Sequence, residues 1–247
     1  MKCLFGQSYY LIFDPKLYSA MKPYPPLGTL YAASAIREAG YDVALFDAML
    51  AQSEAEWETA LNTHQPQVAI IYEDNFNYLS KMCLGRMRQA ALTMINMAKR
   101  RGCTVIVCGS DATDHPTIFL DGGADYVLLG EGEETLIELL ASVSGKSDTS
   151  PEAILGVQSP KTLMPVRRPA MRDIDKLPMP AWDLIDMTKY KNIWLARHGY
   201  FSMNLVTTRG CPYHCNWCAK PIWGQRYNVH SPQTIVKQMK HLHETYG

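Results

Sequence analysis

The stretch 124-ADYVLLGEGEETLIELLASV-143 decides the fold, because an apolar run passes into a helical pattern across a short Gly-Glu-Gly turn. Residues 124–130 predict a buried strand, and residues 131–143 repeat apolar side chains at helical spacing. A second apolar run, 103-CTVIVCG-109, lies just upstream. Apolar strands of about six residues that alternate with helices predict a parallel sheet with helices on both faces.

The same alternation extends back to the amino terminus. Strands are predicted over 2–13, 41–47, 67–73, 103–109 and 124–130, and helices over 27–40, 53–64, 78–102 and 131–143. Ser53, followed three residues later by Glu56, is typical of a helix-capping pair. We therefore predict an α/β fold with a doubly wound, Rossmann-like parallel sheet over residues 1–144.

The composition changes near residue 145. Six prolines fall between residues 151 and 180, which predicts an extended linker over 145–195, with a short hairpin around 154–166. Beyond it, 200–210 predicts a strand, and 231–247 predicts a helix with Ser231 as N-cap and Pro232 at its first position. One strand and one helix cannot bury their own faces, so the unit at 196–247 needs neighbours.

Charge and hydropathy exclude several classes of protein. The 247 residues hold 24 basic and 24 acidic side chains, which leaves no net charge to attract nucleic acid or an anionic membrane. No apolar run approaches the roughly 18 residues of a membrane span. The amino terminus ends its apolar run in Asp-Pro-Lys and not in a signal-peptide cleavage site, so we expect a cytoplasmic protein.

The seven cysteines fall into two groups. Cys3, Cys83, Cys103 and Cys108 are scattered, as small core residues are. Cys211, Cys215 and Cys218 form a CxxxCxxC motif in the loop after a predicted strand, where three thiolates can converge on a soft metal. Zinc would need a fourth ligand, such as His214 or His230. A cubic 4Fe–4S cluster held by three thiolates would keep one iron open.

This motif, with Trp217 directly before the last cysteine, resembles the signature of the radical S-adenosylmethionine superfamily. The resemblance implies that Cys211, Cys215 and Cys218 hold a 4Fe–4S cluster, and that Trp217 lies beside the adenine of S-adenosylmethionine. It also implies a 5′-deoxyadenosyl radical formed with an electron from a donor such as flavodoxin or ferredoxin. A zinc knuckle is the alternative.

Three loops follow predicted strands, at the edge of the sheet where such folds bind ligands. They read 24-YPPLG-28, 108-CGSDAT-113 and 130-GEGE-133. With 177-LPMPAWD-183 and 220-KPIWG-224 they resemble the cobalamin-binding domain that is fused to radical enzymes. The resemblance implies cobalamin contacts at Pro26, Leu27, Gly28, Gly109, Ser110, Asp111, Gly130, Glu131 and Gly132.

The sequence departs from many cobalamin proteins in the loop after its first strand. That loop reads Asp14-Pro15-Lys16, without the Asp-x-His-x-x-Gly pattern whose histidine coordinates cobalt in those proteins. We therefore expect no protein histidine on cobalt. His115, close to the fourth strand, is the residue most able to contradict this expectation.

Together these features predict a flavodoxin-like cobalamin-binding domain at 1–144, a linker at 145–195, and the start of a radical S-adenosylmethionine (β/α) barrel at 196–247. Eight-unit barrels run to about 250 residues, so we expect a carboxyl-terminally truncated chain with little activity alone. The family implies methyl transfer to an unactivated carbon or phosphorus of a small-molecule substrate. The alternatives are a cyclase or rearrangement enzyme with a vestigial cobalamin domain, or a non-catalytic cobalamin- or zinc-binding module.

Overall fold

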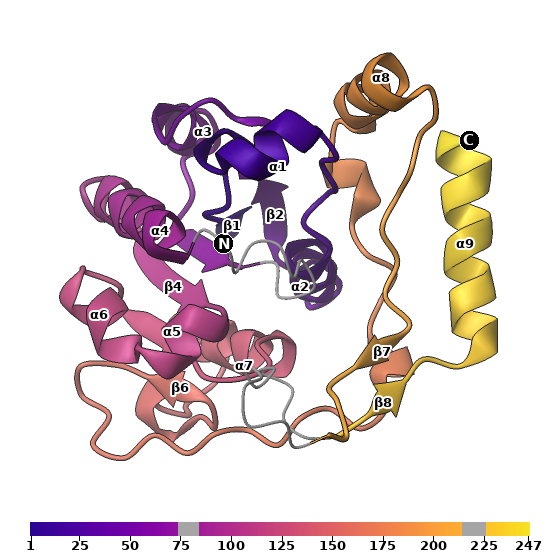
Figure 1. The fold of residues 1–247 in the computed structure, drawn as a ribbon. Coiled ribbons are helices and arrows are strands. Elements are labelled where there is room, and N and C mark those ends of the chain that lie inside the picture. Colours follow the sequence, from indigo (N-terminus) through magenta and orange to yellow (C-terminus); the bar gives the residue numbers. More distant parts are fainter. Residues whose placement is uncertain (74–83, 214–225) are drawn as a thin grey trace.

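A computed structural model describes residues 1–73, 84–213 and 226–247 and shows a six-stranded sheet in the order β2-β1-β3-β4-β5-β6 (Figure 1). The strands are β1 (Lys2–Gly6), β2 (Asp42–Leu45), β3 (Val68–Tyr72), β4 (Thr104–Cys108), β5 (Tyr126–Leu128) and β6 (Val157–Gln158). The first five are parallel, and β6 is antiparallel to β5. The 2-1-3-4-5 order of the parallel strands confirms the predicted flavodoxin-like fold.

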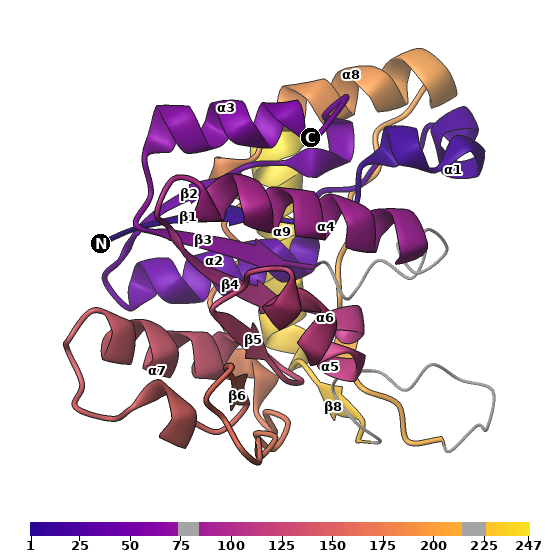
Figure 2. The same cartoon turned by 90° about the vertical axis from the view of Figure 1, so that its left-hand side faces the viewer.

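Helices cover both faces of this sheet, as Figure 2 shows from the side. On one face lie α3 (Ala55–His64), α4 (Leu84–Lys99) and α6 (Pro116–Asp121), and on the other lie α2 (Leu27–Glu38) and α7 (Glu133–Val143). Side chains of the strands alternate between the two faces: Leu4 of β1 packs in the cluster under α3 and α4, and Cys3 and Phe5 pack in the cluster under α2 and α7. The remaining helices are α1 (Pro15–Ala20), α5 (Ser110–Asp114), α8 (Met187–His198) and α9 (Pro232–Tyr246).

The predicted first strand is shorter than its apolar pattern. β1 ends at Gly6, and residues Leu11–Phe13 form a single 3₁₀ turn before α1. Asp14 begins α1, because its Oδ1 accepts the Leu17 N–H at 3.1 Å and Pro15 occupies the first helical position. Local capping chemistry therefore overrides the strand pattern here.

The predicted cap of α3 is also wrong. The helix begins at Ala55 after Glu54, and no side chain caps it. Glu56 instead bonds further back, where its Oε1 accepts the Gln52 N–H at 2.6 Å. The capping-box pattern predicts the right region, but it places the N-cap at Ser53, one residue before the observed N-cap Glu54.

The segment predicted as an extended linker is folded for much of its length. It contributes β6 to the sheet, and α8 runs across its predicted end at residue 195. Ile174, Leu177 and Trp182 are buried in a third apolar cluster that also contains Leu27 of α2 and Leu242 of α9. The expected hairpin survives only as a contact between the Gly156 N–H and the Val166 carbonyl at 2.7 Å, since Val157 and Gln158 pair with β5. The domain boundaries themselves stay a prediction.

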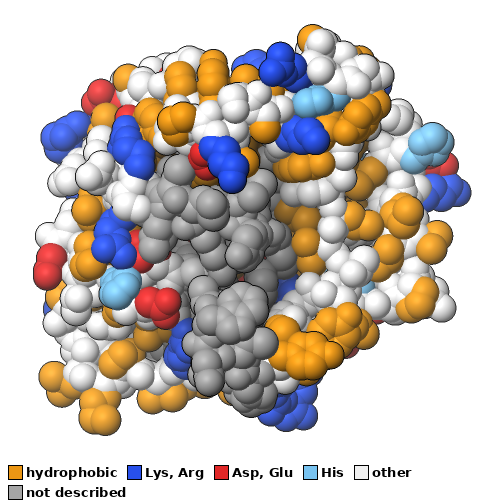
Figure 3. Space-filling model, viewed as in Figure 1, with side chains coloured by type: hydrophobic (Ala, Val, Ile, Leu, Met, Phe, Trp, Pro, Cys, Tyr) orange, Lys and Arg blue, Asp and Glu red, His pale blue; other side chains and the backbone are white. Residues whose placement is uncertain are grey.

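The carboxyl-terminal unit has less strand than its pattern predicts. Only β7 (Thr208–Arg209) is paired, antiparallel to β8 (Asn228–Val229), because residues 201–206 pack as extended chain against the third apolar cluster. The predicted cap of α9 is confirmed, since Ser231 Oγ accepts the Thr234 N–H at 3.2 Å. α9 buries Leu242 and exposes Val236 and Met239. Hydrophobic side chains, drawn in orange, also reach the surface on the right of Figure 3, where α9 lies in Figure 1.

None of the helices in the described ranges combines the length and the apolar character that crossing a bilayer requires.

Candidate cofactor-binding site

The crevice at the carboxyl edge of the sheet lies between β1 and β3, where the chain connections leave in opposite directions. Three polar residues meet there: Gln7 and Ser8 follow β1, and Glu73 follows β3. The Ser8 N–H donates to Glu73 Oε1 at 3.0 Å, and the Glu73 N–H donates to the Cys108 carbonyl at 2.9 Å. Sequence reasoning missed all three residues, because Ser8 and Glu73 meet across 65 positions and the burial of Gln7 depends on the fold.

Gln7 carries an unsatisfied donor in this crevice. Its side chain is buried, with 1% exposure, and its Oε1 accepts the Tyr9 N–H at 2.5 Å, but its Nε2 has no hydrogen-bond partner among the residues that the structure describes. Buried polar groups are nearly always paired, so an orphaned donor at a ligand-binding edge fits a ligand that brings an acceptor. Pro26, which precedes α2 at the same edge, supplies no side-chain cap to the first turn of that helix.

One of the residues predicted to contact cobalamin at 109–111, Asp111, is bonded to a side chain of the protein. Arg88 of α4 grips both carboxylate oxygens of Asp111, with Nε to Oδ2 at 2.7 Å. Both residues line a cavity of about 20 Å³ together with Ser8 and Glu73. Such a cavity holds one water molecule at most, so the Asp111 carboxylate is a structural partner of Arg88 in this arrangement. Its contact with cobalamin stays a prediction, as do those of Gly109 and Ser110.

Two glycines of the predicted site are required by packing. A Cβ on Gly109 would lie 2.8 Å from the Glu73 side chain. A Cβ on Gly132 would lie 2.6 Å from Cys108 Sγ and 2.7 Å from the Tyr72 ring. Gly130 has a φ of 86°, and its N–H donates to Thr113 Oγ1 at 3.1 Å. The two glycine positions therefore pack closely against neighbouring side chains at the sheet edge. Glycine also leaves the backbone accessible, which a large ligand bound at this edge would need.

A buried ion cluster joins the loop after β5 to the segment that carries the cysteines. Arg209 of β7 has a side chain 1% exposed, with Nη1 at 3.2 Å from Glu131 Oε1 and Nη2 at 2.8 Å from Glu133 Oε1. The second oxygen of Glu131 accepts the Met171 N–H. The guanidinium of Arg209 also lies 5.6 Å from the centroid of the Tyr31 ring.

The charges in this cluster stabilise one another. Burial alone would lower the pKa of Arg209, but Glu133 and Glu131 raise it above its ordinary value, so the guanidinium stays charged. Burial raises the pKa of Glu131, and the neighbouring Glu133 raises it further. The predicted cofactor contact of Glu131 stays a prediction, and its carboxylate is shared between Arg209 and Met171.

Of the three cysteines predicted to bind metal, the structure describes one, and its role as a ligand stays a prediction. Cys211 is half-buried and in no disulfide, two positions after Arg209. Cys215, Trp217, Cys218 and His214 lie outside the described residues, as does Cys83. Cys3, Cys103 and Cys108 are buried, as predicted for core cysteines. No group of three metal-ligating side chains occurs within 1–73, 84–213 and 226–247.

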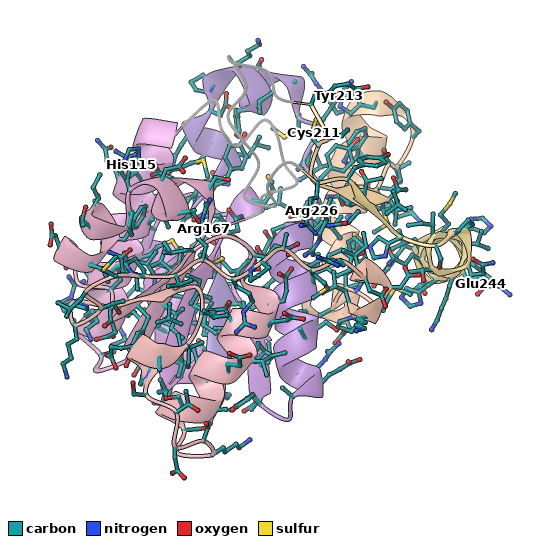
Figure 4. All side chains as sticks on the ribbon, turned by 90° about the horizontal axis from the view of Figure 1, so that it is seen from below. His115, Arg167, Cys211, Tyr213, Arg226 and Glu244 are labelled. Carbon is teal, nitrogen blue, oxygen red and sulfur yellow. The ribbon has the colours of Figure 1, made fainter. Side chains whose placement is uncertain are left out.

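Of the three histidines singled out from the sequence, the structure describes His230 and His115. His230 is buried, stacks on Tyr31 and pairs through Nδ1 with Asp175 Oδ1 at 2.9 Å. His115 is exposed at the end of α5 and lies far from Cys211, on the other side of the view in Figure 4. His230 therefore serves the packing of α9 against the linker and α2.

This fold, with its glycine-rich carboxyl edge, is that of a cofactor-binding α/β domain. Residues 18–140 match the B12 binding domain family. Over these residues the chain belongs to the B12 binding domain family, and its curated relatives include proteins named methyltransferases and one named a cyclase.

Curated relatives cover most of the chain. An uncharacterized methyltransferase of Pyrococcus horikoshii is 28% identical over 90% of this chain and 47% of its own. The anaerobic magnesium-protoporphyrin IX monomethyl ester cyclase of Synechocystis is 24% identical over 90% of this chain and 43% of its own. The cytidylyl-2-hydroxyethylphosphonate methyltransferase of Streptomyces wedmorensis is 30% identical over 56% of this chain and 31% of its own. The chain thus spans less than half the length of these relatives.

Among solved structures, the cobalamin-dependent S-adenosylmethionine radical enzyme OxsB with aqua-cobalamin bound has the same fold. It aligns with a TM-score of 0.72 at 17% identity, over 98% of this chain and 31% of that chain. The complex with aqua-cobalamin and S-adenosylmethionine aligns with a TM-score of 0.71 over 97% of this chain. At this identity the likeness shows the fold, which extends through α8, β7, β8 and α9 as well as the B12 binding domain.

Proposed function

We propose that this chain supplies the cobalamin site and the iron–sulfur site of a radical S-adenosylmethionine methyltransferase. The observation that carries the proposal is the buried contact of Arg209 with Glu131 and Glu133, which brings the segment of Cys211 against a predicted cobalamin loop. Methyl transfer by such an enzyme needs the methyl carrier and the radical source close to one substrate. Relatives named methyltransferases support this reaction class.

The residues that would hold cobalamin lie at the carboxyl edge of the sheet. Pro26–Gly28, Gly109–Asp111 and Gly130–Gly132 are the predicted loops, and Gln7 adds a buried amide donor that suits the amide groups of a corrin. When bound, cobalamin supplies a methyl group that can be transferred. With His115 exposed on α5, we keep the prediction that no histidine of this chain coordinates cobalt.

The residues that would hold the cluster are Cys211, Cys215 and Cys218. Three thiolates suit a 4Fe–4S cluster with one open iron, which S-adenosylmethionine would chelate. Trp217 would lie against its adenine. The substrate would be a small molecule, the electron donor a flavodoxin or ferredoxin, and the setting the cytoplasm.

The proposal predicts that the three cysteines act together. Replacing Cys211, Cys215 or Cys218 by Ala should abolish the absorbance near roughly 400 nm that such clusters give after anaerobic reconstitution, together with bound iron and sulfide. Cys103→Ala is the matched control, because Cys103 is buried in the core and should leave the cluster intact. Stoichiometric zinc without sulfide in the reconstituted protein would overturn the proposal in favour of a zinc-binding module.

Cyclisation is a second candidate, since one relative is named a cyclase. Product analysis separates the two reactions when the chain is tested with the remaining barrel segments of a relative. A product that gains one methyl group supports methyl transfer, and a ring-closed product of unchanged carbon count supports cyclisation.

A further inference from the structure

A polar network, buried at Arg209, Gln238 and His230, joins β7, β8 and α9 to the B12 binding domain and to residues 171–175 of the predicted linker. Besides the bonds of Arg209, the Tyr31 hydroxyl donates to Gln238 Oε1 at 3.1 Å, and Asn228 Nδ2 donates to the Met171 carbonyl at 2.8 Å. His230, stacked on Tyr31, pairs with Asp175. Arg209, Gln238 and His230 are all at least nine-tenths buried.

From this network we infer that Arg209 is a positioning residue, which fixes β7 and the adjoining Cys211 relative to the loop 130–133. The inference rests on the proposed function, because it concerns the cluster that Cys211 would help to hold. Only Gly210 separates Arg209 from Cys211, so their Cα atoms lie within about 7 Å of each other. Gly210 has a φ of 82°, which sets the direction of the chain between the anchor and the cysteine.

The chemistry of the anchor favours one geometry. Arg209 reaches two carboxylates with two different nitrogens, and Glu133 sits in the first turn of α7, where the helix dipole favours a negative charge. An apolar contact tolerates small displacements, whereas a shift of β7 would break the two hydrogen bonds of Arg209 and leave a buried charge without its partner. The guanidinium therefore holds β7 at a fixed place.

Other polar contacts on this surface attach the same unit without touching the cysteine segment directly. β8 is tied to Met171 by Asn228, and α9 is tied to α2 by Gln238. Arg209 differs from both because it lies on the strand that leads into the cysteines. Loss of its charge should move Cys211 while the bonds of Gln238 and Asn228 keep α9 and β8 in place.

The test compares Arg209→Gln, Arg209→Lys and Arg37→Gln in the full chain. Arg37 is the matched control, because it forms a two-bond ion pair with Asp183 that also joins α2 to the linker, but both side chains are largely exposed, at 42% and 63%. The first measurement, on the cluster-free chain, is hydrogen exchange of the His230 amide, which donates to the Thr207 carbonyl beside β7 at 2.9 Å. The second is paramagnetic resonance of the reduced, reconstituted cluster, with and without S-adenosylmethionine.

Arg209→Gln should speed exchange of the His230 amide roughly tenfold or more, while Arg37→Gln stays within about twofold of the unmodified chain. In the cluster, Arg209→Gln should shift and broaden the resonance at unchanged iron content and weaken its response to S-adenosylmethionine. Arg209→Lys should fall between, because a lysine reaches one carboxylate and not two.

Unchanged exchange in Arg209→Gln overturns the anchor. Faster exchange with an unchanged resonance overturns the positioning role and leaves a structural ion pair. If the unmodified chain takes up no iron, the proposed function fails, and the exchange measurement still decides whether the anchor exists. Should Arg209→Gln not fold, Glu133→Gln tests the same contact from the other side.

Discussion

Gln7 combines deep burial with an amide nitrogen that is unpaired within residues 1–73, 84–213 and 226–247, at the edge where β1 and β3 diverge. A protein that kept this group for stability alone would pair it, since an unsatisfied buried donor costs about 1–3 kcal/mol. Its Oε1 bond to the Tyr9 N–H holds the amide in place and leaves Nε2 available. The residue thus has the character of a ligand-binding group in a fold that binds B12.

We therefore expect Gln7→Leu to separate binding from stability. Removing the unpaired donor offsets the lost bond to Tyr9, so the free energy of unfolding should change by less than about 1 kcal/mol. Affinity for cobalamin, measured by its absorbance in a titration, should fall roughly tenfold, which corresponds to the loss of one hydrogen bond. His115→Ala should bind as the unmodified chain does. Equal affinity in Gln7→Leu would place the cofactor elsewhere.

For single residues, the sequence predicts the chemical type of a side chain better than it predicts which other residues that side chain contacts. The buried cysteines and the absence of a histidine after β1 could be read directly from the chain. Glu73 and Arg209 could not, because their partners lie 65 to 78 positions away in the sequence. Gln7 could not, because its burial depends on the fold. The loop 130–133 predicts a cobalamin contact for Glu131, which stays a prediction, and its ion-pair partner Arg209 lies on β7.

Among the elements, α9 and α3 differ in how their first turns are stabilised. Ser231 caps α9 with its Oγ, and its own N–H donates to Asp175, while Ser53 makes no capping bond to α3. Both serines precede helices in the sequence, and only the structure distinguishes them.

Ser231→Ala should lower the free energy of unfolding by about 1 kcal/mol, because the first turn of α9 loses its side-chain acceptor. Ser53→Ala should change it by less than about 0.5 kcal/mol, as for an ordinary surface substitution. Ser231→Asn should restore most of the loss, since Asn is an equally good cap and puts no second negative charge beside Asp175. Urea denaturation of the three variants measures the differences, and equal losses for Ser231→Ala and Ser53→Ala would contradict the assignment.

Periodicity predicted the regular elements, such as the helices α2 and α7 and the strands β2, β3, β4 and β5. It failed where other forces decide. The two-residue strand β6 is too short to carry a pattern, and it forms because β5 offers an open edge. The strand predicted over 200–210 has the right composition, but its apolar residues find more burial against the third cluster than in a two-stranded sheet.

Across the whole molecule, α8 is joined to the end of β2 by a contact between residues 143 positions apart. The Tyr190 hydroxyl donates to Asp47 Oδ2 at 2.7 Å, and the Met49 N–H donates to Oδ1 at 3.0 Å. Burial raises the pKa of Asp47 from 3.8 to about 6, against the opposing effect of these two bonds. The linker is thus held to the sheet through a carboxyl group that titrates near neutrality.

The stability of the chain should therefore depend on Asp47 between pH 4 and 6. Because its pKa is raised in the folded state, the group contributes stability below its unfolded pKa of about 3.9, and this contribution is lost as the pH rises through 6. Asp47→Asn has no such loss, so its free energy of unfolding relative to the unmodified chain should grow by about 2 kcal/mol between pH 4 and 7.

The matched variant is Tyr190→Phe, which removes a hydrogen bond that lowers the pKa of Asp47. Its pH dependence should extend to higher pH than that of the unmodified chain. Urea denaturation across pH 4–8 gives both curves, and parallel curves for Asp47→Asn and the unmodified chain would rule out titration of this group.

The two-residue strand β6 has a consequence for how these molecules behave in a crowded solution. Without it, β5 would present a row of unpaired backbone groups at the end of the sheet, and such an edge pairs readily with another chain. Here Val157 and Gln158 occupy that row, and the Leu129 N–H is taken by the Gly156 carbonyl at 2.7 Å. Pro160 follows and cannot donate a further ladder bond outward. A segment that links two parts of the chain thus also guards the sheet against aggregation, and cutting it between β5 and β6 would expose a template for fibre-like association.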